Sequence, residues 1–456
     1  MSIGSSNNNT YRSTTTLCPF CAQKLDGKII KDGNNVFLHR ICPEHGKYRF
    51  LLSRNGNLYL ELDQFYFTHI KTNKPSGRIT NFWVFVSCEC DQMCPYCSVE
   101  ISNPFNQKMS LDEFKVILRM LKKAKCTFSG GEPLVHPEIL TLIRLGNEHG
   151  IQMQLATNGL KLADFAFCEE IQQSGLQEVR LSIDSFDKKQ AKRIGTESFY
   201  EQKLKALNNL ETLQMTTILS PTIFKGINEN QLISVCEYAK YRPFIRSISV
   251  NGFSYGSWIK AFKPENMIMP DEMMDILHKN YGKKPREEIM TFQMIIQTLL
   301  HLLNIRHCNY EQIIFFVRDG KNLIFLTDFL AINRMKISLK FWSYFSKSNI
   351  WVQRILFFVT MISGISIRTI PLIRPILSLL FSNIMKINIS KYPDTILPVT
   401  LNTNCSIVSS DMMISQQCMS GNFSIVNGKI QQGIGTFTLM KKEEQCAQKK
   451  KTPLIT

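Results

Sequence analysis

Hydrophobic and polar residues recur with two periods along the middle of the chain. Short runs of β-branched and aromatic residues predict strands, and the segments between them repeat apolar residues at helical spacing. The runs predict strands at 82–86, 126–129, 152–156, 178–183, 216–219 and 247–250, and helices at 110–123, 137–148, 162–173, 199–213 and 229–240. Ser110 is the expected N-cap of the first helix, with Glu113 as its capping-box partner. Alternating strands and helices predict right-handed βαβ units and a parallel sheet.

Three cysteines, Cys90, Cys94 and Cys97, follow the first predicted strand in a C-x3-C-x2-C spacing. A tight loop with this spacing can place three thiolates around one inorganic centre. A closed iron–sulfur cluster or a structural zinc takes four protein ligands, so three ligands predict a four-iron cluster with one iron left for a non-protein ligand. The alternatives are three incidental thiols, or part of a zinc site that a distant residue completes.

Further polar and glycine-rich motifs follow or end other predicted strands. Because chemistry in a parallel α/β barrel gathers at the carboxyl ends of the strands, we expect them to share one site with the cysteines. Glycines allow a ligand to approach the backbone closely, although each motif taken alone is also typical of an ordinary turn. The motifs are Ser129-Gly130-Gly131-Glu132-Pro133, Ala156-Thr157-Asn158-Gly159 and Arg180-Leu181-Ser182-Ile183-Asp184.

In order and approximate spacing, the cysteine loop and these motifs resemble the radical S-adenosylmethionine (SAM) superfamily. The resemblance implies a partial (β/α)6 barrel, a 4Fe–4S cluster and SAM bound at its open iron. It also implies reductive cleavage of SAM, abstraction of hydrogen from an unactivated C–H bond, and a reductant such as flavodoxin or ferredoxin. No single catalytic residue is assigned. The implied cofactor-binding residues are Gly130, Gly131, Glu132, Thr157, Asn158, Ser182 and Asp184.

A second group of metal-type ligands lies near the N-terminus. Cys18 and Cys21 form one knuckle, and Cys42 and His45 form another, with a hairpin predicted between them. Cys3His sets of this kind hold zinc or a mononuclear iron. His39 is an alternative fourth ligand, although the C-x2-H spacing favours His45.

The length of 456 residues predicts two or three domains. Fourteen cysteines are too sparse for a disulfide scaffold and favour a reducing compartment, and the polar N-terminus is not a secretory signal. We therefore expect a cytoplasmic protein. The expected divisions are a disordered tail at 1–16, a metal-binding ribbon at 17–75, a radical SAM core at 76–262, and a mainly helical C-terminal domain at 263–456 with an apolar and basic segment at 341–381.

Three segments narrow the resemblance within the superfamily. The N-terminal knuckles and the stretches at 221–229 and 269–274 resemble the tetraether-lipid-synthase-like branch, which implies a lipid or isoprenoid substrate. Members of that branch carry auxiliary clusters, but here the late cysteines stand at no recognisable spacing, which favours loss of one or more of those clusters. These cysteines are Cys308, Cys405, Cys418 and Cys446.

The net charge of +17 favours an anionic partner. The apolar run at 355–367 is shorter than a bilayer span, so it predicts either a helix in the membrane interface or a buried helical hairpin. Our first hypothesis is a radical enzyme of lipid biosynthesis, peripheral at the inner face of the membrane, with no nucleic-acid partner. The alternatives are a radical enzyme that modifies a peptide, nucleoside or RNA, and a non-catalytic cluster-binding protein.

Overall fold

The computed structural model describes most of the chain between residues 10 and 434. The described residues are 10–18, 21, 23–70, 79–87, 89–97, 108–121, 125–255, 259, 261–305, 311–376, 395–403, 420–426 and 429–434. The late cysteines Cys308, Cys405, Cys418 and Cys446 lie outside these residues.

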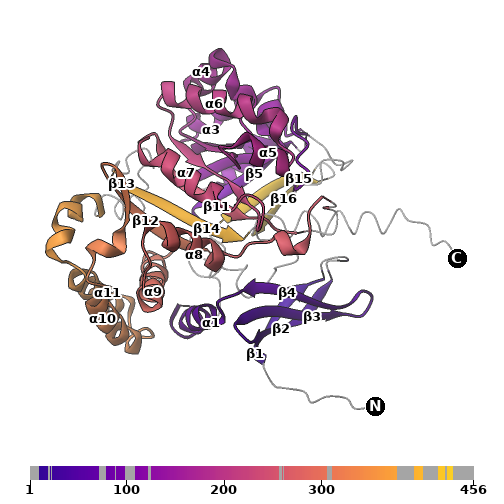
Figure 1. Cartoon of the computed structure of the whole chain (residues 1–456). Helices are drawn as coiled ribbons and strands as arrows, with labels where there is room; N and C mark the ends of the chain where they lie inside the picture. The colour runs from indigo at the N-terminus through magenta and orange to yellow at the C-terminus, as the bar shows by residue number, and fades with distance from the viewer. Residues whose placement is uncertain are drawn as a thin grey trace.

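A four-stranded antiparallel sheet forms the N-terminal module (Figure 1). The predicted hairpin is present as β2 and β3, and Gly33 in its turn has φ +59°, which favours glycine. β1 occupies residues that we expected to be a disordered tail, so the boundary expected at residue 17 is too late. The strands are β1 (Thr10–Leu17), β2 (Lys24–Asp32), β3 (Asn35–Cys42) and β4 (Gly46–Ser53).

The second sheet contains the six predicted strands side by side in chain order, and every neighbouring pair among them is parallel. This arrangement is the strand order of a βαβ series, and it confirms the predicted α/β class. The six strands are β5 (Asn81–Ser87), β6 (Lys125–Gly130), β7 (Gln152–Thr157), β8 (Glu178–Leu181), β9 (Thr217–Leu219) and β11 (Ile245–Gly252); the short β10 (Thr222–Ile223) pairs with β11.

The five predicted helices are present between these strands, and an unpredicted sixth, α5, lies after β8. Ser110 and Glu113 form the expected capping box at the start of α2. The helices are α2 (Leu111–Met120), α3 (Ile139–Glu148), α4 (Phe165–Gln173), α5 (Lys188–Arg193), α6 (Tyr200–Thr212) and α7 (Gln231–Lys240).

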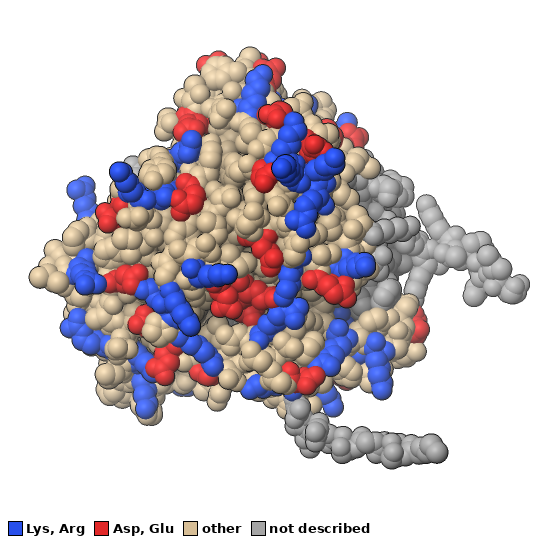
Figure 2. All heavy atoms as spheres, viewed as in Figure 1, with Lys and Arg blue, Asp and Glu red and all other residues tan. Residues whose placement is uncertain are grey.

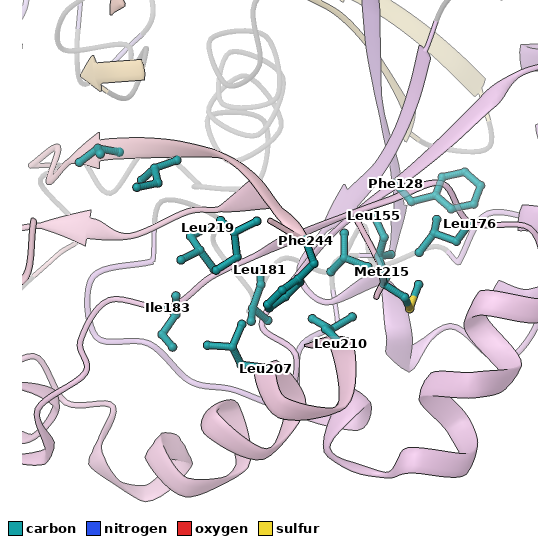
Figure 3. Packing of buried hydrophobic residues seen from close by; sticks show 14 of the residues in the cluster. Phe128, Leu155, Leu176, Leu181, Ile183, Leu207, Leu210, Met215, Leu219 and Phe244 are labelled. Carbon is teal, nitrogen blue, oxygen red and sulfur yellow. The ribbon is translucent and has the colours of Figure 1, made fainter. Parts of the chain in front are cut away.

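These helices cover one face of the sheet and enclose the main hydrophobic core. Figure 3 shows Leu155 and Leu181 from neighbouring strands packed with Leu207 and Leu210 of α6. All four side chains are buried. Burial of one such side chain stabilises the fold by about 1.5–3 kcal/mol. This packed layer therefore holds the strands against the helices and keeps the strand ends that form the site in position.

The C-terminal part of the chain contributes both helices and strands. Its strands extend both edges of the six-stranded sheet: β14 pairs parallel with β11, and β15 pairs parallel with β5. The strands are β12 (Gln312–Asp319), β13 (Asn322–Phe325), β14 (Ile396–Thr403), β15 (Ser420–Val426) and β16 (Lys429–Ile434).

The predicted helical character of the C-terminal region is confirmed by four α-helices and the short helix η7. Of these, α9, α10, α11 and η7 build a second hydrophobic cluster together with α1 and η1, whereas α8 packs on the main core. In the part of the chain that the structure describes, no single helix is long and apolar enough to cross a membrane, but α11 and the following segment to Ile376 qualify together, bent by 114°. The elements are α1 (Gly56–Phe65), η1 (Tyr66–Ile70), α8 (Pro270–Tyr281), α9 (Arg286–Leu302), α10 (Ile332–Tyr344), α11 (Ile350–Ser363) and η7 (Ile367–Leu372).

Candidate functional site

The three cysteines of the C-x3-C-x2-C motif lie on one loop that leaves the end of β5. Backbone hydrogen bonds fold the loop tightly, from the Cys94 amide to Gln92 (3.1 Å) and from the Cys97 amide to Cys94 (3.1 Å). The three thiols are half-buried and close enough to influence one another electrostatically. The structure therefore brings these predicted ligands together at the carboxyl end of the sheet.

The donor set fits a cluster better than a single ion. Burial raises the thiol pKa of Cys90 to about 11 and that of Cys94 to about 12, so a bound metal is needed to keep them as thiolates near neutral pH. Cys90, Cys94 and Cys97 do not form a compact group of ligand atoms of the kind that the N-terminal knuckles form. Wider spacing suits a 4Fe–4S cluster, since each thiolate then binds a different iron.

The Gly130-Gly131 turn is fastened to the start of the cysteine loop. Gly131 donates its amide to the carbonyl of Ser87 (2.8 Å), and Glu132 donates its amide to the carbonyl of Glu89 (2.7 Å). Gly130 has φ +133°, and a Cβ there would stand 2.0 Å from the Ser87 carbonyl oxygen. Only glycine fits this close contact between two backbones, which holds the turn beside the cysteines.

Glu132 connects the ends of two strands, β6 and β7, through its buried carboxylate. It accepts hydrogen bonds from the Thr157 hydroxyl (2.7 Å), the Asn158 amide (2.7 Å) and the Leu134 amide (3.0 Å). Burial raises the pKa of Glu132 to about 7, although these hydrogen bonds act in the opposite direction. Asn158 in turn donates to the Asp91 carboxylate (2.7 Å) beside the first cysteine.

Asp184 is also buried, and its carboxylate is engaged by protein groups. The Tyr96 hydroxyl donates to one oxygen (2.5 Å), and the Thr222 amide donates to the other (2.7 Å). Tyr96 lies inside the cysteine motif, so this contact anchors the loop to β8 and β10. The contact gives Asp184 a positioning role, whereas its expected role at a ribose stays a prediction.

Ser182 lies beside Asp184, and its carbonyl accepts a hydrogen bond from Lys203 Nζ (2.8 Å). Lys203 is buried on α6, and its charge lowers the pKa of the Cys94 thiol, against the larger effect of burial. Neither Lys203 nor Tyr96 was predicted as a site residue. For Lys203 the sequence offers no signal, because a lysine in a polar helix is ordinarily exposed.

The N-terminal knuckles converge as expected. Ligand atoms of Cys18, Cys21, Cys42 and His45 all lie within 4.8 Å of one another. The Cys21 and Cys42 sulfurs are 3.8 Å apart, and His45 Nδ1 is 3.8 Å from the Cys18 sulfur. A tetrahedral zinc with bonds of about 2.3 Å separates its sulfur ligands by about 3.8 Å. The set therefore fits zinc, and His39 is not part of it.

The N-terminal module packs against the loops that surround the cysteine motif. Its residues Leu38 and Phe50 share a hydrophobic cluster with Phe224 and Phe262. The Tyr96 ring contacts Phe224 edge-on, with centroids 5.0 Å apart. The ribbon metal and the cysteine loop therefore belong to one packed structure.

The sheet face opposite the helices carries charged groups. Lys125 on β6 and Glu178 and Arg180 on β8 interact electrostatically, and Glu311 before β12 interacts with Arg180. Burial raises the pKa of Glu178 and Glu311 and lowers that of Lys125 and Arg180. The Arg180 guanidinium lies 5.6 Å from the centre of the Trp83 ring. This face can offer charge and hydrogen bonds to a polar ligand.

Comparisons with known proteins agree with the two sites. The family model described as the radical SAM superfamily matches residues 84–239, and that described as the HMPTM N-terminal zinc ribbon domain matches residues 10–54. The 7,8-dihydro-6-hydroxymethylpterin dimethyltransferase of Methanocaldococcus jannaschii is 23% identical over 362 residues, which cover 70% of this chain and 71% of that protein.

A GTP 3',8-cyclase of Campylobacter jejuni is 28% identical over 217 residues. The aligned residues cover 45% of this chain and only 65% of that protein. The crystal structure of Streptococcus suis SuiB bound to precursor peptide SuiA aligns over 50% of this chain and 49% of that chain, at 16% identity and a TM-score of 0.37. Similarity at that level supports no inference about function. The chain thus carries a domain that matches the radical SAM superfamily at residues 84–239, behind a zinc ribbon match at residues 10–54.

Proposed function

We propose that this enzyme cleaves SAM reductively and abstracts hydrogen from an unactivated C–H bond of a lipid or isoprenoid chain. The chemistry depends on Cys90, Cys94 and Cys97, three thiols on one loop at the carboxyl end of a parallel sheet. A 4Fe–4S cluster with SAM supplies electron transfer and hydrogen abstraction when bound. The chain itself holds and orients these groups.

The roles of the surrounding residues follow from their contacts. The Gly130-Gly131 turn exposes backbone beside the cysteine loop, where it suits the amino group of SAM. Ser182 is half-buried at the end of its strand and suits the ribose, while Glu132 orients Thr157 and Asn158 through its hydrogen bonds. Zinc on the ribbon ligands stabilises the module that packs on the cysteine loop.

The lipid substrate is supported by a broad apolar surface on α10, α11 and η7. Their outer side chains are exposed, whereas their inner side chains belong to the second hydrophobic cluster. The sequence left an interfacial helix and a buried hairpin as alternatives, and only one side of each helix is buried. An exposed apolar surface of this extent is typical of an interaction site for lipid or protein.

A second candidate substrate is a polar ring compound such as a pterin or a guanine nucleotide. Two named relatives act on compounds of this class, to judge by their names. The charged face formed by Lys125, Glu178, Arg180 and Glu311 supports it, because buried charges favour a ligand with matching polar groups.

A product assay separates the candidates. The reconstituted enzyme is incubated with SAM and dithionite, together with a total lipid extract, a reduced pterin or GTP, and 5′-deoxyadenosine is measured. Stimulation by lipid alone supports the first candidate, and stimulation by pterin or GTP alone replaces it with the second. Absence of 5′-deoxyadenosine in every mixture contradicts the proposed activity.

A further inference from the structure

Exposed apolar side chains are concentrated in one part of the molecule. Among the described residues, 20 large hydrophobic side chains are exposed, and 14 of them lie between residues 337 and 370. These 14 side chains belong to α10, α11, η7 and their connections, and we call them the apolar surface. The remaining six are scattered over the rest of the described chain, as is normal for a globular protein.

The two helices are anchored from the inside, which leaves their outer sides free. Met335, Leu339 and Trp342 of α10 and Phe357 of α11 are buried in the second hydrophobic cluster. The outer residues of both helices recur at helical spacing. They are Ile337, Phe341 and Tyr344 on α10, and Ile355, Phe358 and Ile362 on α11, each at least 50% exposed.

Within the chain segment that carries the apolar surface, all charged residues are basic. No Asp or Glu occurs between Asp328 and Asp394, whereas nine Lys and Arg residues do. Elsewhere, on the face shown in Figure 2, basic and acidic side chains are interspersed. Within the described residues, Lys336 pairs with Glu287 of α9, but the exposed side chains of Lys340, Lys347 and Arg368 form no ion pair.

We infer that the apolar surface docks the enzyme onto an anionic lipid bilayer, with α10 and α11 lying along the membrane. The inference deepens the lipid arm of the proposed function, on which it rests, by naming the partner of this surface. Apolar side chains enter the boundary between headgroups and acyl chains, and the flanking cations bind acidic headgroups. Lysine and arginine can reach those headgroups while their aliphatic stems stay in apolar surroundings.

Two further features fit a bilayer rather than a protein partner. Tyr344 and Trp351 are both well exposed, and rings of this amphipathic kind favour the membrane interface. The absence of acidic residues over 65 consecutive positions, 329–393, removes the repulsion that acidic headgroups would otherwise meet. A protein partner would require no such bias in charge.

Vesicle sedimentation tests the inference with the full-length, anaerobically reconstituted enzyme. We expect co-sedimentation with vesicles of phosphatidylglycerol and phosphatidylcholine, and much weaker binding to phosphatidylcholine alone. Higher salt should weaken the binding, because it screens the cations. The same samples are assayed for 5′-deoxyadenosine without vesicles, so that docking and catalysis are read separately.

Paired variants with matched controls locate the surface. Ile355→Ser with Val359→Ser, two exposed residues one turn apart on α11, should lower vesicle affinity about tenfold. The control is Val116→Ser with Met120→Ser, an equally spaced exposed pair on α2. Lys340→Ala with Lys347→Ala should lower the vesicle affinity roughly fivefold for each cation removed. Lys189→Ala with Lys192→Ala on α5 should change the vesicle affinity little.

Each outcome decides one of the two claims. No vesicle binding, or binding that the α11 variant does not weaken more than its α2 control, overturns the docking surface. If the wild type does not bind vesicles and the α11 variant changes the oligomeric state, the apolar surface binds a second copy of the chain. This result also overturns the docking surface. Vesicle binding without formation of 5′-deoxyadenosine under any condition leaves the docking intact and contradicts the proposed function.

Discussion

Glu132 illustrates how a single buried side chain organises the site. Its carboxylate accepts three hydrogen bonds, which join the turn after β6 to the end of β7. Burial nevertheless raises its pKa to about 7, so the folded protein binds this proton more tightly than the unfolded chain, whose value is about 4.3. Between these values the unfolded chain has fewer protons bound, and stability falls as the pH rises.

Glu132→Gln should remove this dependence. Relative to the wild type, the variant should become more stable by up to about 1.4 kcal/mol for each pH unit between about 4.3 and 7. Denaturant unfolding of both proteins at several pH values in this window measures the difference. Glu138→Gln, at the exposed N-cap position of α3, is the control, and parallel curves for Glu132→Gln and wild type would contradict the assignment.

The two metal sites should be separable by single substitutions. Cys94→Ala should abolish iron binding and 5′-deoxyadenosine formation while zinc stays bound, because the ribbon ligands form their own compact group. Cys42→Ala should abolish zinc binding while iron stays bound. Metal analysis of both variants checks this, and loss of both metals in either variant would show that the sites are not independent.

Residues with short-range motifs were predictable from the sequence, and residues defined by long-range contacts were not. Cys90, Cys94 and Cys97 stand together in the chain, so their spacing alone predicts the loop. The bond from Tyr96 to Asp184 joins residues 88 positions apart, and no local pattern encodes it. The expected ligand His45 lies with the three ribbon cysteines, since its turn places it three residues beyond the β3 strand end.

Among the elements, six strands of the main sheet and five of its helices were predictable because they have clear local periods. β1 was missed because its sequence is rich in threonine and polar, and it gains stability only by pairing with β2. β14 and β15 were missed for a related reason, since their partners β11 and β5 are far away in sequence. Strand formation there depends on an available sheet edge, which local sequence does not reveal.

The contact between the ribbon and α8 depends on one carboxylate. Asp271 Oδ2 accepts hydrogen bonds from the Ser53 hydroxyl (2.9 Å), the Arg54 amide (2.8 Å) and the Asn55 amide (2.7 Å). Asp271→Ala should therefore lower the free energy of unfolding by about 3 kcal/mol and expose the ribbon to protease. Denaturant unfolding and limited proteolysis measure both effects. Asp275→Asn, on the exposed side of the same helix, is the control, and equal behaviour of the two variants would contradict the role of Asp271.

At the scale of the whole molecule, three parts contribute to the proposed function. They are the zinc ribbon, the radical SAM sheet and the apolar surface. The ribbon packs on the loops around the cysteine motif, the sheet places polar groups at its strand ends, and α10 and α11 present apolar side chains outward. The net charge of the sequence is +17, and its excess of basic residues is clearest in the segment that contains these two helices, where positions 329–393 hold no acidic residue.

The three-cysteine loop should support SAM cleavage that lipid stimulates. The most direct test is anaerobic analysis of iron, sulfide and zinc in the reconstituted enzyme, followed by measurement of 5′-deoxyadenosine with SAM, reductant and a total lipid extract. We expect about four irons and one zinc per chain, with faster 5′-deoxyadenosine release when lipid is present. Iron content near zero, or the absence of 5′-deoxyadenosine from a fully loaded enzyme, would contradict this expectation.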